Sequence, residues 1–101
     1  MSKRLEFDRD AQSEFDDGAD WYLDQGGDEL KKKYIDAVRA ALHAIVEHPT
    51  VFPVAFGSNV RRSNVGNFPY VILFEEQAHR ILIYSVFHTS RNPIVWRGRI
   101  D

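Results

Sequence analysis

Cysteine is entirely absent from this chain of 101 residues. A sequence without thiols can form neither a disulfide framework nor a thiolate metal site, and the absence fits a reducing compartment. The histidines do not replace the missing thiols, because His43 and His48 have no carboxylate–histidine pattern of a metal site around them. We therefore expect no metal and no cofactor.

Long apolar runs are also lacking. Residues 1–10 mix charged and apolar side chains, unlike a signal peptide, and no segment approaches the length that crosses a bilayer. We expect a cytoplasmic protein without membrane contact. A chain of this length has too few apolar residues to fill two cores, and residues 1–101 should therefore form one domain. An aromatic content of 13% supplies large side chains for that core.

Lysine is missing from the second half, where all the cationic side chains are arginines. Residues 1–50 contain 7 basic and 12 acidic side chains and residues 51–101 contain 6 and 3, so the halves carry −5 and +3. The forked guanidinium suits carboxylates and phosphates, which indicates an acidic protein or a nucleic acid as partner. The pI of about 6.1 favours a protein, because nucleic-acid-binding domains are usually basic. The arginines are Arg61, Arg62, Arg80, Arg91, Arg97 and Arg99.

The first half predicts a strand and two helices. Residues 5–7 alternate between apolar and acidic side chains, which is the period of a short strand. Asp8 or Asp10 can cap the following helix, whose apolar residues recur at spacings of three and four up to the glycine pair at 26–27. A second apolar stripe, from Leu30 to Ile45, predicts another helix that ends at the next proline.

The second half predicts strands. Residues 51–57 have no clean period and contain Pro53, so we expect a packed connection there. Of three expected strands, the last two form a hairpin through a turn at residues 76–79. The order β-α-α-β-β-β predicts an α+β domain with a helical hairpin packed on one face of a mostly antiparallel sheet. The expected strands are residues 59–65, 68–75 and 80–88.

An ordered set of short phrases is more specific than any one of them. With this set the chain resembles the RelE/ParE toxin superfamily over nearly its whole length, in particular the ParE, or plasmid-stabilisation, branch. The resemblance implies two antiparallel helices on a curved antiparallel sheet. The phrases are VRR at Val60–Arg62, NFPY at Asn67–Tyr70, VFHTSRNP at Val86–Pro93 and WRGR at Trp96–Arg99, with Ala11, Glu14 and Trp21-Tyr22 on the first helix and HPTVFP after the second.

The resemblance also implies a function and a partner. Members are toxins of type II toxin–antitoxin systems, neutralised by an antitoxin whose C-terminal segment covers the toxin and whose N-terminal part usually binds operator DNA. The ParE branch poisons DNA gyrase, whereas the ribonuclease branch cleaves mRNA on the ribosome. A third interpretation is a homologue retained only to form a complex that represses its own operon.

RNA cleavage would require a base for the 2′-hydroxyl, cations for the crowded phosphate and an acid for the leaving oxygen. His88 could act as base or acid, and Arg61, Arg62 and Arg91 could supply the cations. The ribonuclease branch, however, typically has a cation where this chain has Pro69-Tyr70 and an aromatic hydroxyl where it has Thr89. We therefore expect a toxin that binds gyrase without chemistry of its own, with the mRNA endonuclease as the alternative.

Structural roles compete with functional ones at several of these positions. His88 could be hydrogen-bonded to backbone, Arg91 could pair with a carboxylate of the acidic first helix, and Trp96 could anchor the tail on the sheet rather than stack on a base. Trp21 and Tyr22 are expected in the core with one exposed edge. Arg61 and Arg62 alternate faces on a strand, so at most one meets a given partner. The candidate partner-binding residues are Arg61, Arg62, His88, Arg91, Trp96, Arg97 and Arg99.

Overall fold

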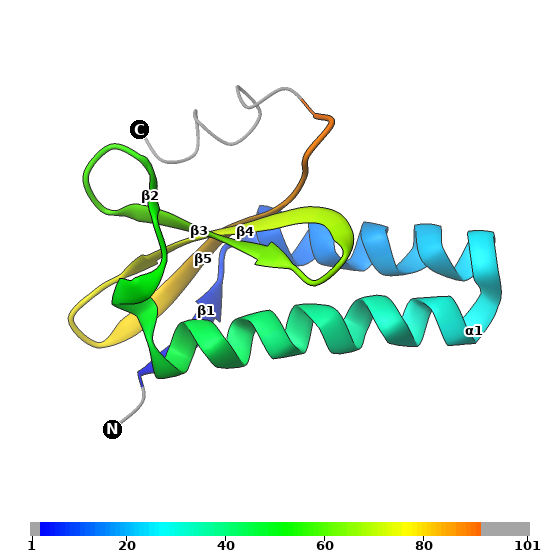
Figure 1. Ribbon diagram of the computed structural model, residues 1–101, viewed down its shortest axis with the longest axis horizontal. Coiled ribbons are helices and arrows are strands. Elements are labelled where there is room, and N and C mark those ends of the chain that lie inside the picture. Colours follow the sequence, from blue (N-terminus) through cyan, green and yellow to red (C-terminus); the bar gives the residue numbers. More distant parts are fainter. Residues whose placement is uncertain (1–2, 92–101) are drawn as a thin grey trace.

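The helical part of the molecule is a hairpin. The computed structural model describes residues 3–91, in which β1 (Arg4–Phe7) leads directly into α1 (Arg9–Glu47). Asp8 caps α1, because its side chain accepts a hydrogen bond of 2.9 Å from the backbone N–H of Asp10. At Gly27 the chain leaves the helical conformation, with φ 72° and ψ −165°, and a positive φ of this kind favours glycine. The predicted hairpin is therefore confirmed, with a first arm (residues 9–26) antiparallel to a second arm (residues 28–47) (Figure 1).

The sheet contains five strands in the order β1-β5-β4-β3-β2. All neighbouring strands are antiparallel except β1 and β5, the first and last strands in the sequence, which pair in parallel. The hairpin and the sheet form two layers, as Figure 1 shows. The α+β architecture is confirmed. After α1 the elements are η1 (Pro49–Val51), β2 (Val54–Phe56), β3 (Val60–Val65), β4 (Phe68–Glu76) and β5 (Arg80–His88).

The expectation of a connection without strand structure at residues 51–57 was wrong. This segment contains β2, an edge strand that pairs with β3 through Val54 and Arg61. Pro53 precedes the strand, and its carbonyl accepts the N–H of Arg62 at 3.0 Å, so a residue without an N–H still joins the edge as an acceptor. Three residues are too few for a period of two to be recognised in the sequence.

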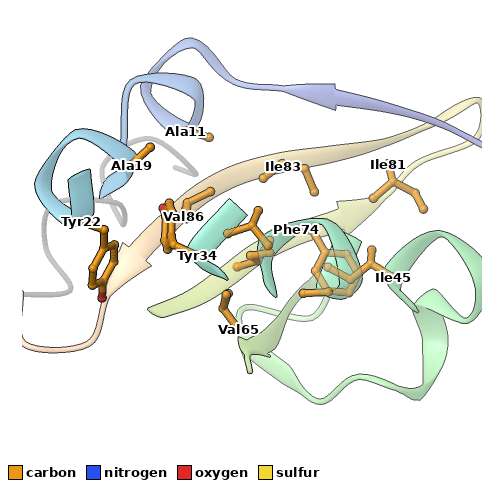
Figure 2. Packing of buried hydrophobic residues seen from close by; sticks show 13 residues of the cluster. Ala11, Ala19, Tyr22, Tyr34, Ile45, Val65, Phe74, Ile81, Ile83 and Val86 are labelled. Carbon is orange, nitrogen blue, oxygen red and sulfur yellow. The ribbon is translucent and has the colours of Figure 1, made fainter. Parts of the chain in front are cut away.

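The main core lies between the hairpin and the sheet. Tyr34 and Ile45 of the second arm are fully buried against Phe74 of β4 and Ile83 of β5, as Figure 2 shows. A smaller buried cluster lies on the other face of the sheet and includes Val60, Val71, Leu73 and Phe87. Both faces of β4 and β5 are therefore buried, which explains why their apolar residues occupy both parities.

Candidate partner-binding site

A cleft of about 370 Å³ opens between the first arm of α1 and the end of the β4–β5 hairpin where β4 begins and β5 ends. Its helix wall belongs to the first arm, and its sheet wall belongs to β4, β5 and the turn after β5. The cleft brings together two of the predicted binding residues, a histidine and an arginine. Its lining residues are Glu14, Asp17, Gly18, Trp21, Tyr70, Val86, His88, Ser90 and Arg91.

The spacing of the first arm positions the helix wall. Asp17, Gly18 and Trp21 follow Glu14 by three, four and seven positions, which places them on one helix face. Tyr22 is 7% exposed, which confirms its predicted place in the core, but Trp21 is 55% exposed and the same prediction for it was wrong. The indole of Trp21 packs edge-on against the ring of Tyr22, with centroids 5.0 Å apart, and this contact holds it at the protein surface beside the core.

Gly18 allows the first arm to lie directly on the aromatic rings of the core. A Cβ atom at this position would lie 2.5 Å from the hydroxyl oxygen of Tyr34 and 3.3 Å from that of Tyr70. Burial raises the pKa of Tyr34, with the neighbouring tyrosines acting in the same direction, so its hydroxyl stays protonated at neutral pH. The glycine is therefore required by packing, and it leaves the middle of the helix wall without a side chain.

Glu14 fastens the helix wall to the sheet. Its carboxylate accepts the hydroxyl of Ser85 at 2.8 Å and the backbone N–H of Val86 at 3.2 Å. Ser85 is fully buried, so the carboxylate satisfies a polar group that has no access to water. In the sequence, Glu14 was noted only as part of the family pattern. The polar Ser85 within an otherwise apolar strand indicates a buried hydrogen-bond partner, but only the fold shows that this partner is Glu14.

His88 is oriented by the turn that follows β5. Its Nδ1 atom accepts the backbone N–H of Ser90 at 3.1 Å and lies 2.7 Å from the hydroxyl of the same residue. Tyr70 packs edge-on against the ring, with centroids 5.0 Å apart. Since Nδ1 is an acceptor, the proton of the neutral ring lies on Nε2. The predicted hydrogen bond from His88 to backbone is therefore present, with the backbone as donor.

Arg91 stands on the sheet wall of the cleft. Its backbone N–H donates to the carbonyl of His88 at 3.0 Å, which closes the turn. Among residues 3–91 its guanidinium forms no ion pair, so the predicted pairing with a carboxylate of the first helix is not observed. The positive charge is close enough to Tyr70 to oppose the rise in the pKa of that phenol, which is caused first by burial and then by Tyr22.

Comparison with known proteins identifies the family. The family model for the ParE toxin of the type II toxin–antitoxin system parDE matches residues 5–93. The chain belongs to the ParE toxin family. A chain of the chromosomal ParDE toxin–antitoxin system from P. aeruginosa has the same fold, with a TM-score of 0.74 and 17% identity over 86% of this chain and 96% of that one. A search of curated proteins finds no significant match to the sequence.

The two arginines of β3 do not belong to the cleft of this ParE-family chain. Arg61 donates to the backbone carbonyls of Phe52 at 2.6 Å and Thr50 at 3.4 Å, so it fastens the segment between η1 and β2. Arg62 is exposed and pairs in register with Leu73, a residue of the cluster on the sheet face away from the helices. The prediction that adjacent arginines face opposite ways agrees with these environments.

Of the remaining arginines of the second half, Arg80 has a structural role, and the others lie outside the described residues. Arg80 bridges Glu6 and Gln77 and joins β1 to the turn of the β4–β5 hairpin. The hydrogen bond from Arg80 lowers the pKa of Glu6, and the charge of Arg4 adds to this effect. Three predicted binding residues lie outside the described residues 3–91, namely Trp96, Arg97 and Arg99.

Within residues 3–91, no group of three or more histidine, aspartate or glutamate side chains is placed to hold a metal ion. No helix among these residues is both long and apolar enough to cross a membrane.

Proposed function

We propose that this ParE-family chain is a growth-inhibiting toxin that acts in the cytoplasm by binding DNA gyrase, and that a cognate antitoxin neutralises it. One observation carries the choice of binding over cutting. The cleft collects His88 and Arg91, whereas Arg61 and Arg62 lie on β3 and contact other parts of the molecule. The four residues that an endonuclease would use are not assembled at one place.

The hydrogen bonding of His88 supports the same choice. A general base must have a free nitrogen lone pair within reach of the 2′-hydroxyl. The Nδ1 atom of His88 already accepts the N–H of Ser90, and the Nε2 atom carries the proton of the neutral ring. The neutral histidine can therefore donate a hydrogen bond into a complex, but it lacks an available acceptor for proton abstraction.

The antitoxin belongs to the proposal because family membership and the solved relative both name a ParDE system. In the proposed complex the antitoxin covers the cleft, and contact with operator DNA occurs only through the antitoxin. An aromatic and charged cleft is a suitable anchor point, since interfaces draw most of their energy from a few partly buried aromatic and arginine side chains.

The decisive experiment compares two targets in the same preparation. The purified chain is added to a gyrase supercoiling assay and, separately, to a translating extract whose transcripts are mapped for cleavage. We expect loss of supercoiling with intact mRNA, and restoration of supercoiling when the protein encoded by the adjacent reading frame is added. His88→Ala, which would abolish an endonuclease, should leave transcripts unchanged because none are cut.

Other outcomes would replace the proposal. Cleaved transcripts that disappear with His88→Ala would assign the ribosome-dependent endonuclease. Normal growth after induction without antitoxin, together with unaffected supercoiling, would assign a homologue retained only for its complex. Supercoiling that remains unchanged at all concentrations would remove gyrase as the target.

A further inference from the structure

The helix wall of the cleft joins an exposed aromatic ring to an unpaired carboxylate. Asp17 and Trp21 are four positions apart, so their Cβ atoms are neighbours on the helix surface at roughly 5–6 Å. Asp17 is exposed and forms no hydrogen bond or ion pair with any residue of the described range 3–91. Trp21 is 55% exposed and is held by its contact with Tyr22.

The first arm also has a strong excess of negative charge. Residues 8–29 contain nine acidic side chains and one basic one, Arg9. Asp20 and Asp24 are exposed, and neither forms an ion pair within residues 3–91. Lys33 pairs with Glu29, but no ion pair within residues 3–91 offsets the carboxylates of Asp17, Asp20 and Asp24, so this surface attracts a positively charged ligand and repels phosphate.

We propose that the cleft accepts an arginine or lysine side chain from a partner protein, with the cation over the indole of Trp21 and paired to Asp17. A cation gains from an indole face when it lies within about 6 Å of the ring centroid. The neighbouring positions of Asp17 and Trp21 allow one cation to meet both groups. Identifying that partner as the antitoxin rests on the proposed function.

The sheet wall gives the bound segment a direction. Arg91 faces the cleft from the opposite side and has no ion pair within residues 3–91, so it favours a carboxylate or carbonyl of the partner. A segment that offers a cation to the helix wall and an acceptor to the sheet wall meets both charges. A segment with the reverse order would bring like charges together at both walls.

The first test uses a defined probe and needs no antitoxin. A blocked alanine-based peptide with one central arginine is titrated into the full chain, and the indole N–H signal of Trp21 is followed by NMR. We expect a saturable shift with a dissociation constant of about 1–10 mM. The matched peptide with glutamine at the centre should produce a shift at least roughly fivefold smaller, since a neutral side chain cannot form an ion pair with Asp17.

Paired variants locate the binding site. Asp17→Asn should reduce the arginine-dependent shift by roughly fivefold or more, whereas Asp20→Asn removes the same charge from an exposed position outside the cleft and should retain most of it. Equal shifts with the arginine and glutamine peptides would overturn the proposal. An equal effect of the two asparagine variants would overturn it as well, because it would indicate a general field rather than a site.

The second test identifies the partner. The purified protein of the adjacent reading frame is titrated into the chain by calorimetry, with Trp21→Ala expected to weaken binding roughly 30-fold and Asp20→Asn less than about threefold. One arginine or lysine of that protein should show strong coupling to Asp17→Asn in a double-mutant cycle. Equal affinity for the Trp21→Ala variant would overturn the assignment of the antitoxin to this cleft. Absence of binding to the unmodified chain would instead overturn the proposed function, while the peptide test would still decide the chemistry of the cleft.

Discussion

The two ends of the β4–β5 hairpin use charged side chains in opposite ways. At the turn end, Arg80 binds Glu6 and Gln77, and Lys3 pairs with Glu76 at 3.1 Å. At the cleft end, Asp17 and Arg91 stand on facing walls without an ion pair within residues 3–91. The turn end is where β1 is fastened to the sheet, and the cleft end is where charge remains available for a partner.

This difference separates stability from recognition in a small protein. A charge that is already paired within the fold gains less from a ligand than an unpaired charge does, because part of its electrostatic interaction is already made. Charges held at a cleft wall gain their partner only on binding, so evolution can change them with little effect on folding. The comparison predicts that the paired charges of the turn end contribute modestly to stability, because they are partly exposed, and that the walls of the cleft contribute to binding, with Gly18 as an exception.

The largest expected effect comes from the core between these ends. Phe74 is fully buried and packs edge-on against Phe52, with centroids 5.6 Å apart, so Phe74→Ala should lower the free energy of unfolding by about 3–5 kcal/mol. Trp21→Ala at the cleft should lower it by less than about 1 kcal/mol, because over half of the side chain is already in water. Urea denaturation of the two variants measures both values. Similar losses would contradict the assignment of Trp21 to recognition.

Gly18→Ala tests whether a residue that lines the cleft also contributes to the stability of the fold. Alanine improves helix propensity by about 1 kcal/mol, but its Cβ would lie 2.5 Å from the hydroxyl oxygen of Tyr34. We expect a net loss of about 1–3 kcal/mol in the free energy of unfolding, measured by urea denaturation.

The control for this prediction removes the atom that the new methyl group would meet. Adding Tyr34→Phe to Gly18→Ala should recover part of the loss, although the ring carbon Cζ would still be 2.9 Å from the methyl group. A Gly18→Ala variant more stable than the original chain would show that helix propensity outweighs the contact.

The sequence predicted the architecture more completely than the cleft. The periodicity of α1 and the apolar runs of β4 and β5 arise because whole faces of these elements are buried. Such patterns repeat within a few residues, so they can be recognised in a short stretch of sequence. The cleft depends on Trp21 and Arg91, residues 70 positions apart that meet only because β1 pairs with the last strand, β5, and the hairpin packs on the sheet. The sequence also gives no indication that Arg61 donates to a backbone carbonyl, an arrangement that distinguishes it from the predicted binding residues in the cleft.

Arg61→Ala should cost about 1–2 kcal/mol in the free energy of unfolding, because the carbonyls of Phe52 and Thr50 lose a charged donor. Arg62→Ala is the matched control and should change stability by less than about 0.5 kcal/mol, since Arg62 is exposed and, within residues 3–91, its guanidinium donates to the side chain of Asn64 alone, at 3.3 Å. Thermal denaturation of both variants under one buffer decides the ranking. Equal effects would remove the structural role that separates Arg61 from the exposed arginines.

The smallest expected effect concerns acid sensitivity at the turn end. The hydrogen bond from Arg80 lowers the pKa of Glu6 in the folded chain below its ordinary value of 4.5, so the unfolded chain binds a proton more readily than the folded one. The stabilisation is therefore present above about pH 4.5 and is lost as the pH falls through the folded pKa. Urea denaturation between pH 6 and pH 3 should show a shallower decline for Glu6→Gln than for the original chain, because glutamine does not titrate. Parallel declines would show that the Glu6–Arg80 pair contributes nothing to acid stability, and the distinction between paired charges at the turn end and unpaired charges at the cleft would then rest on geometry alone.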